Sequence, residues 1–182
     1  MAKLLWVDTE TSGLHAQKNG ILSIAGLYEE ESTETSDVFD YRCRPHPNDK
    51  LNSRALEVNG FKRKEVYNFP CSYHILSTIE GFLLTHLAGD KFTICGYNTS
   101  FDFRFIEAWF EKHGNENFNT YFHREYIDVL PMVRRYFKSR AIPIENHKLP
   151  TVAEYFGISG AFHTALDDIL ATYQIYHHVK ED

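Results

Sequence analysis

The chain has 182 residues, of which 43% are hydrophobic, 15% aromatic and 24% charged. This composition excludes a disordered protein, and we expect residues 1–182 to form one globular domain with a substantial core. The formal net charge of −6 argues against a protein that coats nucleic acid through unspecific phosphate contacts, although metal ions bound in a site can offset such a charge.

The cysteines and the apolar segments bear on the compartment. Cys43, Cys71 and Cys95 are far apart and form no CxxC pair, which indicates a reducing environment. The N-terminal apolar run is too short for a signal peptide, and no apolar stretch approaches the roughly 20 residues that span a bilayer. We therefore expect a cytoplasmic protein that does not contact membranes.

The first elements along the chain are predicted strands. Residues 4–7 are an unbroken apolar run, typical of a short buried strand. After a polar loop, residues 21–28 and 37–43 predict two more strands, joined by a polar turn over 29–35. These short separations favour an antiparallel three-strand meander, which Pro45 and Pro47 end.

Helices and strands alternate in the rest of the chain. The apolar spacing predicts helices over 51–59, 73–87, from Ser100 or Phe101 to Phe110, up to Phe137, 149–156 and 164–179, with strands over 92–97 and 126–130. The cluster Lys62-Arg63-Lys64 favours a solvated helix face over a phosphate contact. The pattern predicts one α/β domain with a mixed sheet.

Two carboxylates follow the first strand. If the extended geometry persists to Glu10, Asp8 and Glu10 point to the same face. Two like charges at so short a distance raise the pKa of one carboxylate unless a cation lies between them. A hard divalent cation is the natural ligand of such a pair. A polar turn at the strand end is the alternative, since Asp, Thr, Ser and Gly all favour turns.

Further candidates lie near two helix starts. Asp102 is in the first turn of a predicted helix after a strand, where it can bind a ligand or simply complement the helix dipole. His163 precedes the last helix, and Asp167 and Asp168 lie in its first turn. Helical periodicity alone does not decide which of these two aspartates faces a site.

Three motifs, in this order, resemble those of the DEDDh (DnaQ-like) family of 3′–5′ exonucleases. They are Asp8-Thr9-Glu10-Thr11-Ser12-Gly13-Leu14, Asn98-Thr99-Ser100-Phe101-Asp102 and His163-Thr164-Ala165-Leu166-Asp167-Asp168. The third motif, His-x-Ala-x-x-Asp, selects Asp168 over Asp167. Two positions depart from the family pattern: Tyr97 stands where a His is usual, and Ser12 where Thr is frequent.

The resemblance implies a ribonuclease H-like fold, in which a mixed five-stranded sheet, a three-strand antiparallel meander plus parallel strands, is flanked by helices. It implies two Mg²⁺ ions, for which Mn²⁺ can substitute, held by Asp8, Glu10, Asp102 and Asp168. His163 is the implied general base, because an imidazole has a suitable pKa. These five residues are the expected catalytic set.

The resemblance also implies a substrate and its contacts. The 3′ end of single-stranded or frayed DNA is expected to lose 5′-mononucleotides, with the backbone around Glu10 and Thr11 at the 3′ hydroxyl. Leu14 and Phe101 are expected to contact the last bases, and Asn98 the strand. Their alternative roles are ordinary packing and turn formation.

Other functions remain open at this stage. The enzyme could act on RNA, or the chain could be a catalytically silent nucleic-acid-binding module attached to a DNA polymerase or repair protein. A structural calcium site is a third alternative, but it would leave His163 without a role. The sequence does not decide between monomer and dimer.

Overall fold

A computed structural model describes residues 3–30, 35–160, 162 and 164–180. One mixed sheet has the strand order β3-β2-β1-β4-β5. The strands are β1 (Lys3–Thr11), β2 (Ile21–Glu30), β3 (Thr35–Arg42), β4 (Phe92–Gly96) and β5 (Phe122–Asp128). Strands β1 to β3 form the antiparallel meander, while β4 pairs in parallel with both β1 and β5. The expected five-stranded mixed sheet is confirmed.

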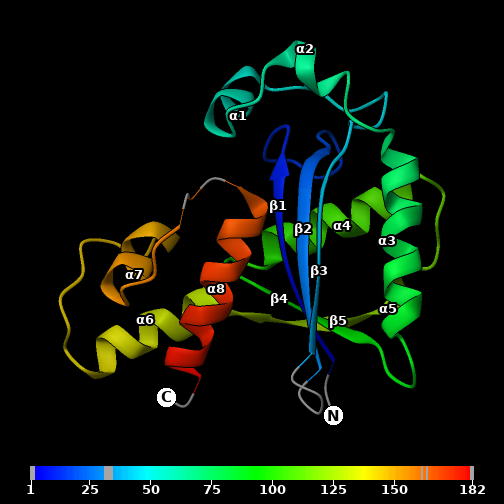
Figure 1. Ribbon diagram of the computed structural model, residues 1–182. Helices are drawn as coiled ribbons and strands as arrows, with labels where there is room; N and C mark the ends of the chain where they lie inside the picture. Colours follow the sequence, from blue (N-terminus) through cyan, green and yellow to red (C-terminus); the bar gives the residue numbers. More distant parts are fainter. Residues whose placement is uncertain (1–2, 31–34, 161, 163, 181–182) are drawn as a thin grey trace.

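Helices cover both faces of this sheet (Figure 1). They are α1 (Ser53–Val58), α2 (Arg63–Val66), α3 (Ser72–His86), α4 (Ser100–Lys112), α5 (Phe118–Tyr121), α6 (Val129–Ser139), α7 (Leu149–Tyr155) and α8 (Ala165–Val179). Alternation along β1 divides the core: Leu5 and Val7 pack with α3 and α4, whereas Leu4 and Trp6 pack with α6, α7 and α8. Asp8 and Glu10 continue the second of these two faces.

The largest differences from the sequence predictions concern β1, β5 and α5. Strand β1 continues through both carboxylates to Thr11, with an irregularity in its pairing between Glu10 and Thr11. Strand β5 begins earlier than predicted, and it also ends earlier because the side chain of Asp128 accepts a hydrogen bond from the Leu130 backbone and starts α6 there. The short helix α5 was not predicted.

Three smaller predictions concern exposure and chemistry. Lys62, Arg63 and Lys64 are exposed at the start of α2, which agrees with a solvated helix face. Cys43, Cys71 and Cys95 are free thiols. Among the described residues, no helix has the length and apolar character needed to cross a membrane.

Candidate active site

The end of β1 brings three carboxylates together. Asp8 and Glu10 lie two residues apart on the sheet face that α8 covers, and Asp168 lies in the first turn of α8. One carboxylate oxygen from each of the three lies within 4.8 Å of the other two, and all three side chains are partly buried. The extended geometry on which the sequence argument depended does persist to Glu10.

The first turn of α8 also separates the roles of its two aspartates. Thr164 caps the helix: its Oγ1 accepts a hydrogen bond from the backbone N–H of Asp167 at 3.2 Å and donates one to Asp167 Oδ2 at 2.7 Å. Asp167 is therefore engaged in capping. Asp168 is the one that faces Asp8 and Glu10, as the third motif implies.

Asp102 approaches from the opposite face of the sheet. Its Oδ1 accepts hydrogen bonds from the backbone N–H of Thr9 at 3.0 Å and from Thr9 Oγ1 at 2.6 Å. Asp102 is 3% exposed, and among the described residues it does not belong to the 4.8 Å group. Thr9 thus anchors the fourth carboxylate beside the other three, a role that the sequence analysis did not assign.

We call the four carboxylates of Asp8, Glu10, Asp102 and Asp168 the acidic edge; burial and nearby charges raise the pKa values of Asp8, Glu10 and Asp102. Burial, and then the charges of Asp102, Asp168 and Glu10, hold the pKa of Asp8 well above its usual range. Burial and the charges of Asp168 and Asp102 raise the pKa of Glu10 to about 7. Burial also raises the pKa of Asp102 to about 7, although the hydrogen bonds from Thr9 oppose this shift.

The acidic edge has the chemistry of a divalent metal site. None of the described Lys, Arg or His residues forms a salt bridge with Asp8, Glu10 or Asp102. Carboxylate oxygens are the preferred ligands of Mg²⁺ and Mn²⁺, and a bound cation stabilises the ionised carboxylates that burial and nearby negative charges disfavour. The residues present therefore fit such a metal.

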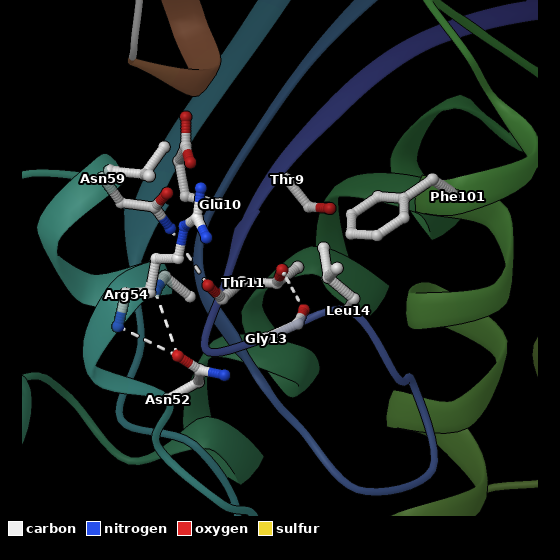
Figure 2. A pocket seen from close by; sticks show the side chains of 11 residues that line it. Thr9, Glu10, Thr11, Gly13, Leu14, Asn52, Arg54, Asn59 and Phe101 are labelled. Atoms are coloured by element: carbon white, nitrogen blue, oxygen red, sulfur yellow. Dashed lines mark hydrogen bonds between the residues drawn. The ribbon is translucent and has the colours of Figure 1, made fainter.

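A hollow of about 290 Å³ opens beside Glu10, between β1, α1 and the start of α4. We call it the β1 hollow. Figure 2 shows Leu14 and Phe101 on one side of the hollow, and Glu10 beside Arg54 and Asn59 on the other. Leu14 is 78% exposed, although it is a large apolar side chain. An apolar wall beside a polar floor suits a nucleobase attached to a sugar.

Hydrogen bonds fix the floor of the β1 hollow. Thr11 Oγ1 donates to the carbonyl of Gly13 at 2.7 Å, and Asn59 Nδ2 donates to the carbonyl of Thr11 at 3.0 Å. A Cβ on Gly13 would lie 2.5 Å from the Asn19 side chain, so this turn requires glycine. The sequence analysis did not identify Arg54 and Asn59 as lining residues.

One expected site residue lies away from the β1 hollow, and another lies outside the described residues. Asn98 does not line the β1 hollow; it follows β4, with φ at 64°, and its N–H donates to Asp128 Oδ1 at 2.9 Å. The sequence analysis missed Asp128, although an Asp directly after a predicted strand and before a helix is a capping signal. His163, the expected general base, lies outside the described residues.

The comparison with known families identifies a match. A family model described as an exonuclease, RNase_T, matches residues 5–176. This range contains all three motifs of the sequence analysis and nearly the whole described fold.

Known proteins and structures agree with that match. An oligoribonuclease from Halorhodospira halophila is 24% identical over 98% of this chain and 93% of its own length. Exonuclease I from E. coli, solved with a dT13 oligonucleotide, superposes with a TM-score of 0.81 at 18% identity, over 99% of this chain. Exonuclease I from Methylocaldum szegediense gives a TM-score of 0.79 at 18% identity over the whole chain. The chain spans 41% of the length of each of these exonuclease I chains.

Proposed function

This chain belongs to the DnaQ-like family of 3′–5′ exonucleases, and on that premise we propose that it removes 5′-mononucleotides from the 3′ end of single-stranded or frayed DNA. The observation that carries the proposal is the acidic edge, in which Asp8, Glu10 and Asp168 lie within 4.8 Å of one another. The repulsion among these carboxylates destabilises the metal-free site, and a bound metal ion would relieve it.

Asp8, Glu10, Asp102 and Asp168 are the proposed ligands of two Mg²⁺ ions, for which Mn²⁺ can substitute. When bound, such ions stabilise the charge that develops on the attacking and leaving oxygens of a phosphodiester. Thr9 keeps Asp102 in place through its two hydrogen bonds. Because their pKa values are raised to about 7, Glu10 and Asp102 are ionised only above about pH 7. The acidic edge should therefore bind a cation more tightly above that pH than below it.

The other residues position the strand and move the proton. The backbone around Glu10 and Thr11 forms the floor of the β1 hollow and is proposed to meet the 3′ hydroxyl. The exposed Leu14 and the partly buried Phe101 are proposed to pack against the terminal bases. His163 is proposed to take a proton from the attacking water, and Asn98 to contact the strand.

RNA is the second candidate substrate. The oligoribonuclease of Halorhodospira halophila matches over nearly the full length of both chains, whereas the exonuclease I structures share the fold with a chain of more than twice this length. This whole-length match favours short RNA as the alternative to DNA.

Product analysis on matched oligonucleotides tests both candidates. DNA and RNA of one sequence, labelled at either end, are incubated with Mg²⁺, with EDTA, and with the Asp8→Ala and His163→Ala proteins. We expect Mg²⁺-dependent release of 5′-mononucleotides from the 3′ end of DNA, lost in both variants. If the protein cleaves RNA faster than DNA, RNA is its substrate and the DNA proposal is wrong. No cleavage of either polymer, with binding intact, would instead indicate a catalytically silent binding module.

A further inference from the structure

A second hollow, of about 570 Å³, opens at the carboxyl end of β4. We call it the β4 hollow. Three basic side chains line it, Arg134 from α6 and His147 and Lys148 from the segment before α7. Tyr97, Asn98 and Asn146 add polar groups. The proposed catalytic chemistry assigns no role to the three basic residues.

The β4 hollow adjoins the acidic edge. Strands β1 and β4 run in parallel as neighbours, so their carboxyl ends share one edge of the sheet. The approach is close, since a Cβ on Gly96 would lie 2.9 Å from the carbonyl oxygen of Val7. Asp128, which holds the backbone of Asn98, is also near enough to raise the pKa of Asp102. Asn98 lines the β4 hollow and is thus linked through Asp128 to the neighbourhood of Asp102.

The two strongest cations in the β4 hollow are available to a ligand. Arg134 and Lys148 are exposed, and neither forms a salt bridge with any residue that the structure describes. Asp128, at the end of β5, accepts hydrogen bonds from the backbone of Asn98 and Leu130 at one oxygen. In a chain of net charge −6, a hollow lined by Arg, His and Lys is not a consequence of general positive charge.

The segment that carries His147 and Lys148 is held in place. Tyr97 Oη donates to the carbonyl of His147 at 2.6 Å, which ties this segment to the end of β4. Burial raises the pKa of Tyr97, so the hydroxyl keeps its proton and remains a donor. Asn146 Oδ1 accepts from the backbone N–H of Lys148 at 2.9 Å. Tyr97 is the residue that departs from the family's second motif, and here it acts as a positioning residue.

We propose that the β4 hollow binds a backbone phosphate of the substrate strand on the 5′ side of the scissile bond, through Arg134 and Lys148. This inference rests on the proposed function. If the terminal nucleotide occupies the β1 hollow, the rest of the strand leaves the acidic edge in another direction, and the β4 hollow offers cations there. Arg matches a phosphate with paired N–H donors, and Lys adds a point charge.

Substrate length provides the test. A dinucleotide without a 5′ phosphate carries only the scissile phosphate, whereas dT12 or rA12 also carries phosphates upstream. The Arg134→Gln/Lys148→Gln protein is compared with wild type and with Arg135→Gln. Arg135 is an exposed arginine on the same helix that does not line the hollow, so it controls for charge. Whichever polymer the wild type cleaves is used for both lengths.

We expect kcat/KM of the double variant on the long substrate to fall about tenfold, mostly through KM, because glutamine cannot form charge-assisted hydrogen bonds with a phosphate. The dinucleotide should change by less than about twofold, as should both substrates with Arg135→Gln. The slope of log affinity against log salt should fall by about 0.7 for each phosphate that the variant no longer neutralises. Equal decreases on the two lengths, or an equal decrease in the Arg135→Gln control, would overturn the inference.

Binding separates this inference from the proposed function. Fluorescein-labelled dT12 and rA12 are titrated by anisotropy into Asp8→Ala proteins with and without the double substitution. If the wild type cleaves no substrate, the exonuclease proposal fails, yet weaker binding by the double variant would still support the phosphate site. Active enzyme whose binding does not depend on Arg134 and Lys148 would overturn the phosphate site alone.

Discussion

Two sets of buried carboxylates in this molecule differ in whether a basic side chain pairs with them. The side chain of Asp49 is only 3% exposed, and Lys112 of α4 forms an ion pair with it. Lys112 Nζ also donates to the carbonyls of Ala16 and Asn19, at 2.7 and 2.6 Å. At the acidic edge, Asp8, Glu10 and Asp102 have no such cation among the described residues.

This difference distinguishes structure from function. A buried charge that a fold requires is normally paired and hydrogen-bonded, because leaving it unpaired is costly. The Asp49 pair follows that rule and ties the 13–20 loop region to α4. Asp8, Glu10 and Asp102 of the acidic edge depart from that rule, and their pKa values are raised instead. Perturbed groups of this kind are typical of functional sites.

The largest expected effect comes from removing one charge at the acidic edge. Asp8→Asn should lower exonuclease kcat/KM by about 10³-fold or more, because a proposed metal ligand is removed. In EDTA, at a pH above the raised pKa of Asp8, the same variant should melt at a higher temperature than wild type, because one repelling charge is gone. Initial rates and thermal melts of the same preparation measure both. A lower melting temperature in EDTA would contradict the repulsion that distinguishes this site from Asp49.

Removing Lys112, the cation that pairs with Asp49, should instead lower the stability and leave substrate binding unchanged. Lys112→Met leaves Asp49 buried without its partner, which should lower the free energy of unfolding by about 3–5 kcal/mol. Denaturant unfolding measures this decrease, and the folded fraction should keep the wild-type KM. Combining Lys112→Met with Asp49→Asn removes the orphan charge and should recover part of the stability. No recovery would show that Lys112 acts mainly through the carbonyls of Ala16 and Asn19.

The sequence predicted one of these two regions and not the other. Asp8 and Glu10 are two residues apart on a strand, so alternation alone predicts that they share a face. Asp49 and Lys112 are 63 residues apart and come from a loop and a helix end, and no local pattern joins them. The β4 hollow was missed for the same reason, since residues from three separate segments line it.

Boundaries and choices between neighbours also needed tertiary structure. Periodicity could not separate Asp167 from Asp168, and the capping bonds of Thr164 separate them in the fold. The predicted strand over 126–130 ends earlier in the fold because Asp128 starts a helix at a position where the apolar run continues. Thr9 appears in the first motif, but its bonds to Asp102 depend on a contact 93 residues away.

The stabilisation of the folded state by bound Mg²⁺ should depend on pH. Glu10 and Asp102 have pKa values of about 7 in the folded chain, above the usual unfolded values near about 4. Between these limits the folded state binds more protons than the unfolded state, so in EDTA the stability from these groups is lost as pH rises through about 7. Mg²⁺ must displace those protons, and its stabilising effect should therefore be larger at about pH 8 than at about pH 6.

Thermal melts across this pH range, with Mg²⁺ or EDTA, measure the effect. Saturation at about 100 times the dissociation constant corresponds to about 2.7 kcal/mol. The Asp8→Asn protein is the control, because it retains every histidine and lacks one interacting carboxylate. A Mg²⁺ effect of the same size at both pH values would contradict the predicted linkage. So would an unchanged effect in the Asp8→Asn control.

The smallest effect is expected at Asp167, which lies one residue before a proposed metal ligand. Its carboxylate accepts a hydrogen bond from Thr164 and complements the start of α8, so Asp167→Ala should cost about 0.5–1 kcal/mol of stability. Because Asp168 and not Asp167 faces Asp8 and Glu10, exonuclease activity should stay within about twofold of wild type. Asp168→Ala, measured beside it, should abolish nearly all activity with little change in stability, since it also relieves repulsion. A comparable decrease of activity in the two variants would mean that the first turn of α8 as a whole, rather than one carboxylate, completes the acidic edge.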